Sequence, residues 1–109
     1  MDFLSSVRNF HNSNLYFSKG ELSKIFACYS LGVSKGNWKD YAIHFGKRES
    51  SFYMFKHSLA SPDCILTKSK KNKKNIIFYD LKFSNVTKSK FHKIDDILAL
   101  LRRKEFDIL

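Results

Sequence analysis

The chain has 109 residues, a length that suits one compact domain. Its apolar fraction of 43% and aromatic fraction of 16% exclude an intrinsically disordered chain. Lys and Arg outnumber Asp and Glu by 20 to 10, which gives a net charge of +10. No apolar run reaches the ~18 residues of a membrane-spanning helix, and the N-terminus lacks the basic-then-apolar pattern of a signal peptide. We therefore expect a cytoplasmic protein with no membrane partner.

The source of the charge and the state of the cysteines follow from composition. Lys supplies 16 of the 20 cations, which fits the codon usage of an AT-rich genome, with an anionic partner such as nucleic acid as the alternative. Cys28 and Cys64 have no C-x-x-C spacing. We expect them to be two reduced thiols.

The first strong structural signal is a helix start. Ser18 and Glu21 fit the S-x-x-E capping box, in which each side chain bonds the other residue's backbone amide. Apolar residues then recur at helical spacing in one stripe: Leu22, Ile25, Phe26, Tyr29 and Val33. Gly36 is suited to a left-handed terminus. The pattern predicts a helix over about residues 19–34.

Two aromatic-rich segments, 41–45 and 51–55, predict a β-hairpin around the polar connector 46–50. Antiparallel pairing sets Ile43 opposite Phe52. One face then carries the expected core residues Tyr41, Ile43, Phe45, Phe52 and Met54. The other face carries Ala42, His44, Tyr53, Phe55 and His57, and it is aromatic enough to suggest a cover.

Further strands are predicted at 64–68 and 75–81, with a weaker one at 82–88, before a helix at about 93–104. The acids at the start of that helix and the bases at its expected end match the helix dipole. These residues are Asp95 and Asp96, then Arg102, Arg103 and Lys104.

The order α-β-β-β-β-α with short connections predicts an α+β domain of two layers, with an antiparallel sheet of about four strands. Both helices have a single apolar stripe, so we expect them to cover one face of the sheet. Residues 1–15 carry no capping signal and are predicted to be a loose N-terminal arm. Residues 16–109 form the expected single domain.

The sequence offers no constellation for catalysis or metal binding. His44 and His57 share a predicted face, but the register separates them by about 20 Å, too far for one metal ion. No serine lies in a G-x-S-x-G elbow, and no phosphate-binding glycine motif is present. We therefore expect a protein that is not an enzyme, with no catalytic residue, metal or cofactor.

One connector concentrates positive charge, and it is the candidate contact for an anion or nucleic acid. Its cations are Lys68, Lys70, Lys71, Lys73 and Lys74. Tyr53 and Phe55 would offer stacking surfaces beside it. The alternatives are a solvated tip that discourages aggregation and aromatic rings covered by the N-terminal arm or a second subunit.

The segment Trp38-Lys39-Asp40-Tyr41-Ala42-Ile43 resembles a family of short alphaproteobacterial proteins that form a domain of unknown function. The similarity includes the start of the first helix, the aromatic strand 52–55, the basic connector and the closing Leu-rich helix. It spans roughly residues 16–104. The resemblance implies no activity, catalytic residue or cofactor.

Two hypotheses of function follow from these patterns. The first is a non-catalytic module that binds an anionic partner, nucleic acid in first place, through the basic connector and the adjacent aromatic rings. The alternative is a protein-interaction module or homodimer joined through the aromatic sheet face or an edge strand.

Overall fold

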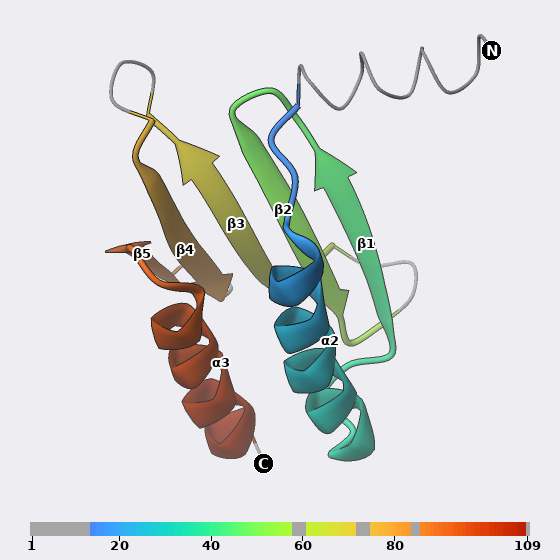
Figure 1. Cartoon of the computed structure of the whole chain (residues 1–109). Coiled ribbons are helices and arrows are strands. Elements are labelled where there is room, and N and C mark those ends of the chain that lie inside the picture. The colour runs from blue at the N-terminus through green and yellow to red at the C-terminus, as the bar shows by residue number, and fades with distance from the viewer. Residues whose placement is uncertain (1–13, 58–60, 72–74, 84–85, 109) are drawn as a thin grey trace, which may run out of the picture.

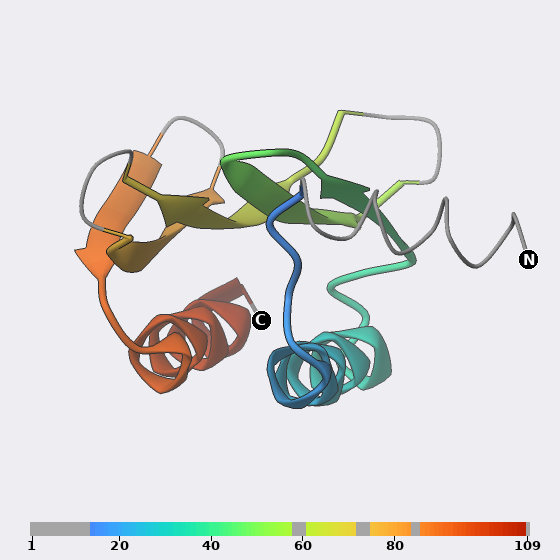
Figure 2. The same cartoon turned by 45° about the horizontal axis from the view of Figure 1, so that its top comes forward.

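The computed structural model describes residues 14–57, 61–71, 75–83 and 86–108. Five strands form one antiparallel meander in which neighbours in sequence are neighbours in the sheet (Figure 1). The elements in chain order are α2 (Lys19–Ser34), β1 (Asp40–Phe45), β2 (Glu49–Phe55), β3 (Cys64–Lys70), β4 (Ile77–Phe83), β5 (Val86–Phe91) and α3 (Ile94–Ile108). Both helices lie on the same side of the sheet (Figure 2), which confirms the predicted two-layer α+β class. Of the expected N-terminal arm, residues 1–13 lie outside the described part of the chain.

The first helix begins and ends where its sequence signals indicate. The Ser18 hydroxyl accepts a hydrogen bond from the Glu21 amide at 3.1 Å, and the Glu21 carboxylate accepts one from the Ser18 amide at 2.7 Å. This reciprocal pair is the predicted capping box. After the helix, Gly36 has φ of 81°, a left-handed conformation that glycine adopts at little cost.

The predicted hairpin is confirmed in its register. Ile43 pairs with Phe52, and Tyr41 pairs with Met54. Phe52 and Met54 are fully buried beneath the helices, whereas Tyr41, on the first strand of the sheet, is 43% exposed. The Tyr41 ring still stacks on Phe52 with ring centroids 5.3 Å apart.

The core lies between the sheet and the two helices. Trp38 at the corner between α2 and β1 is only 1% exposed and packs near Phe83, with ring centroids 6.3 Å apart. It closes the core at this corner. The other fully enclosed apolar side chains include Ile25 and Cys28 of α2, Leu66 of β3, Leu81 of β4, and Ile97 and Leu101 of α3.

The sheet has five strands where about four were expected, and the weaker strand predicted at 82–88 divides between β4 and β5. Phe83 pairs with Val86 and Lys82 pairs with Thr87, so the chain reverses direction within that segment. The last helix also continues to Ile108. Arg102 and Arg103 therefore lie in the middle of α3 rather than in its last turn, and the expected match of these bases to the helix C-terminus is wrong.

Within the described residues, neither helix is long and apolar enough to cross a membrane.

The aromatic cluster at Phe52 gives a direct test of the core. Its ring lies 5.3 Å from Phe26 and 5.9 Å from Tyr29 between centroids. We expect Phe52→Ala to lower the free energy of unfolding by about 3–5 kcal/mol, because a large cavity replaces the ring. Val86→Ala, at a side chain that is 53% exposed, should change it by less than about 0.5 kcal/mol. Urea unfolding of both variants measures the difference, and equal effects would contradict this description of the core.

Candidate functional site

Lys68, the first cation of the predicted anion site, is held inside the molecule. It lies within β3 on the face that the helices cover, and the residue is only 9% exposed. Its ammonium donates to Glu21 Oε1 and to the backbone oxygen of Tyr16, both at 2.8 Å. The charge of this lysine is already paired in the interior, so Lys68 cannot serve as a surface contact for an anion. We therefore remove it from the candidate anion site.

Glu21 is the centre of a buried polar network. Besides bonding the Ser18 amide, its carboxylate accepts hydrogen bonds from Lys68 and from the Tyr79 hydroxyl. Burial acts to raise the pKa of Glu21, but the hydrogen bonds from Lys68, Tyr79 and Ser18 outweigh it and hold that pKa below its ordinary value. The pKa of Tyr79 is raised by burial first, and then by its bond to the Glu21 carboxylate. The network is therefore ionic at neutral pH.

A second pair of bonds fixes the chain that leads into this network. The Leu15 amide donates to the Gly46 carbonyl at 2.7 Å, and the Ser50 hydroxyl donates to the Leu15 carbonyl. Tyr16 then packs against Phe45 with ring centroids 4.6 Å apart. These bonds fix Leu15 and Tyr16 against the β1–β2 hairpin.

Four other basic residues gather at one end of the sheet, where the β1–β2 tip lies beside the end of β3. The Lys70 amide donates to the Arg48 carbonyl at 2.9 Å, which joins the β1–β2 tip to the end of β3 (Figure 1). Lys47, Arg48 and Lys71 are exposed, and Lys70 is half-buried. We call these four residues the basic end. Glu49 is the exposed acid beside them.

The backbone of each tip explains how these cations are presented. At Gly46, an added β-carbon would lie 2.8 Å from the Glu49 carbonyl oxygen, so only glycine fits this close turn. In the second tip, the Lys71 amide donates to the Ile76 carbonyl at 3.0 Å. Lys73 and Lys74, two further members of the predicted site, lie outside the described residues.

Phe78, which the sequence reasoning did not select, contributes an aromatic ring beside the basic end. The Lys71 ammonium lies 5.9 Å from the centroid of the Phe78 ring, within range of a cation–π contact. Tyr53 and Phe55 are on the face away from the helices, as predicted, and both are half-buried. Along β2, however, they are four and six residues from Glu49, or roughly 13 and 20 Å. The structure therefore separates these two rings from the charge that they were expected to accompany.

A row of polar side chains crosses the sheet face opposite the helices. The cross-strand pairs place His44, Ser51, Thr67 and Asp80 side by side on β1 to β4. The Ser51 hydroxyl bonds the Thr67 hydroxyl at 3.1 Å. Burial, and then the charge of Glu49, raise the pKa of Asp80. The Ser51 bond runs toward Thr67 and away from His44, so the row does not pair a nucleophile with a base.

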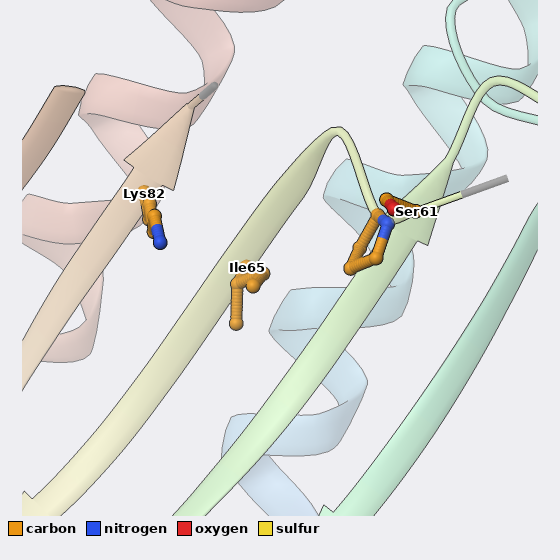
Figure 3. A pocket seen from close by; sticks show the side chains of 4 residues that line it. Ser61, Ile65 and Lys82 are labelled. Atoms are coloured by element: carbon orange, nitrogen blue, oxygen red, sulfur yellow. The ribbon is translucent and has the colours of Figure 1, made fainter. Parts of the chain in front are cut away.

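The same face holds a shallow pocket of about 330 Å³, lined by Ser61, Pro62, Ile65 and Lys82 (Figure 3). Lys82 and Ile65 come from β4 and β3, and Ser61 and Pro62 come from the chain that leads into β3. In the described part of the chain, no group of three or more His, Cys, Asp or Glu side chains is placed to hold a metal ion.

Fold and site together define a two-layer α+β domain with a basic end where two hairpin tips meet. The chain belongs to a family described as a protein of unknown function, DUF2794, which matches residues 15–90. The match begins at Leu15, which bonds the β1–β2 hairpin, and ends within β5. No curated protein and no solved structure matches the chain.

The buried network predicts how stability depends on pH. Because the folded-state pKa of Glu21 is lowered, its stabilising effect is present above the ordinary pKa of a glutamate and is lost as the pH falls through the lowered value. Glu21→Gln leaves the Lys68 ammonium buried without its counter-ion, and we expect it to cost about 3 kcal/mol at neutral pH. Because glutamine does not titrate, the stability of the variant should also fall less than that of the wild type as the pH becomes acidic.

Urea unfolding over a pH series measures both effects. Asp95→Asn is the control, since the Lys24–Asp95 pair has side chains that are 51% and 69% exposed; it should cost less than about 1 kcal/mol. A Glu21→Gln variant as stable as this control would contradict the role given to the network.

Proposed function

We propose that the chain is a non-catalytic binding module for a single-stranded nucleic acid, with the basic end as the phosphate contact. The observation that supports this proposal is the hydrogen bond from Lys70 to Arg48, which brings the cations of two hairpin tips to one place. Lys47, Arg48, Lys70 and Lys71 carry four positive charges against the single charge of Glu49. Such a cluster attracts phosphates irrespective of base sequence.

A single strand suits the surface next to the basic end better than a duplex. Phe78 lies on the open sheet face and Tyr53 lies further along it, and unpaired bases stack on such rings. Glu49 and Asp80 are on the same face and repel phosphates. The nucleic-acid backbone would therefore follow the hairpin tips while its bases turn toward the sheet.

The second candidate is a protein-interaction module that uses the aromatic sheet face. It is favoured by Tyr53, Phe55 and Ile65, which are half-buried on the face away from the helices. Binding to a protein through these side chains would depend little on salt, whereas phosphate contacts weaken steeply as salt rises. Salt dependence therefore separates the two candidates.

The state of the two cysteines bears on the cellular compartment. We propose a cytoplasmic protein without a cofactor; Cys28 and Cys64 are both buried thiols, in keeping with a reducing compartment. We also propose that the family is the alphaproteobacterial one that the segment from Trp38 to Ile43 resembles.

Fluorescence anisotropy with a labelled oligonucleotide of about 12 nucleotides tests the proposal. RNA, single-stranded DNA and duplex DNA of the same mixed sequence are compared from about 50 mM salt upward. We expect the single strands to bind more tightly, with affinity that falls linearly on a log–log plot against salt.

The double variant Lys47→Gln with Arg48→Gln removes two charges from the basic end. We expect its affinity to fall roughly tenfold or more and the salt slope for a single strand to decrease by about 1.4. The control, Arg102→Gln with Arg103→Gln, removes the same charge from exposed positions in the middle of α3. If both double variants lose affinity equally, net charge and not the basic end is responsible. If the wild type does not bind at low salt, the proposal fails.

A further inference from the structure

The two edges of the sheet differ in how well they are protected against pairing with another strand. At one edge, β5 has an irregular register with β4 near Tyr79 and Leu81, and its sequence includes Lys88 and Lys90. Irregular pairing and lysines are the usual means of blocking an edge. At the other edge, β1 pairs with β2 in six consecutive positions without a shift and has no Lys, Arg or Pro among its residues. Among the described residues, the edge formed by β1 is therefore regular in its pairing and carries few of the features that block an edge.

The backbone groups that β1 directs away from the sheet can be assigned from its hydrogen bonds. The Gly46 amide donates to the Glu49 carbonyl at 2.8 Å, at the end of the β1–β2 pairing. Because successive residues of a strand alternate in the direction of their amide and carbonyl groups, those of Tyr41, Ile43 and Phe45 point outward. The Tyr41 amide instead donates to Asp40 Oδ1 at 2.8 Å, which agrees with its outward direction.

We propose that two copies of the chain associate by pairing their β1 strands antiparallel, about a two-fold axis that passes through Ile43. This register sets Ile43 opposite Ile43 of the second copy, and Tyr41 opposite Phe45 of the second copy. All three residues direct their amide and carbonyl groups outward, so the pairing joins them by backbone hydrogen bonds once the Tyr41 amide exchanges Asp40 Oδ1 for the carbonyl of Phe45 of the second copy. The two five-stranded sheets then form one continuous sheet with every helix on the same side.

The side chains of β1 are self-complementary in this register. Tyr41 and Phe45 form an aromatic cross-strand pair on each side of the axis, a pairing that stabilises antiparallel strands. Tyr41 is 43% exposed in the single chain, and the pairing would cover it. Ala42, small and exposed, meets His44 of the second copy on the open face.

Charges of both signs lie at each end of the proposed junction. The acid of the strand, Asp40, is at one end, and Lys47 follows the other end. Antiparallel pairing about Ile43 therefore brings Asp40 of each copy close to Lys47 of the other copy. In the same register Lys39 of each copy lies opposite Lys47 of the other copy, so Asp40 offsets a like-charge contact at each end of the junction.

The test combines oligomeric state with the amide protons that the register assigns. By sedimentation velocity over a range of concentrations, we expect the wild-type chain to form a dimer. By hydrogen exchange, the amides of Ile43 and Phe45 should become slower to exchange as concentration rises. This second measurement uses the wild-type chain and does not depend on any variant folding.

Ile43→Lys places two ammonium groups against each other at the axis and should leave the chain monomeric. Val86→Lys, at an exposed position on the opposite edge, is the control and should remain a dimer. A wild type that is monomeric throughout overturns the proposal. So does a dimer in which the Ile43 and Phe45 amides gain no protection, since the contact then lies elsewhere, for example on the open face. Protection of these amides at the lowest concentration also overturns it, because another part of the same chain would then occupy the edge.

Discussion

The rest of the structure depends on one requirement, that the buried ammonium of Lys68 has a counter-ion. Glu21 supplies that charge from the first turn of α2, 2.8 Å from the Lys68 nitrogen, while Lys68 extends from β3. A buried charge without its partner is costly, so α2 has little freedom to slide or rotate on the sheet. The same lysine bonds the carbonyl of Tyr16, and Tyr79 adds a bond from β4. One carboxylate thereby sets the position of the first helix, of the chain leading into it, and of two central strands.

The basic end is a consequence of the meander that this network holds in place. In an up-and-down sheet, the first and third connections lie at the same end, so the β1–β2 tip and the end of β3 become neighbours although 22 residues separate Arg48 from Lys70. Lys68, two residues before Lys70, faces the helices and is neutralised, whereas Lys71 lies beyond the strand and is exposed. Lys68 therefore has a structural role, whereas Lys71, three residues further along the chain, lies at the surface.

Local signals predicted the parts of the fold that are determined locally. The capping box, the helix over 19–34 and the Ile43–Phe52 register each depend on residues close in sequence, and each is confirmed. The position of Lys68 could not be predicted in the same way, because its partner Glu21 is 47 residues away and its charge resembles that of its neighbours in the connector. Phe78 and Arg48 were missed for the same reason: they join the site only through the order of strands, which composition and periodicity do not contain. The predicted strand 64–68 already contained Lys68, so alternation with Cys64 and Leu66 could have placed it on the covered face.

The net positive charge of the chain opposes self-association, but β1 pairing would keep the two basic ends apart. Strands that pair antiparallel point in opposite directions, so the two basic ends lie at opposite ends of the joined sheet rather than against each other. The rings that would meet at the junction are already held in place: Tyr41 contacts Phe26 and Tyr29 of α2, and Phe45 contacts Tyr16. Little side-chain entropy would then be lost on pairing, which lowers the cost of association. In such a dimer most of the basic end would lie away from the junction, and Lys47 alone would belong to both.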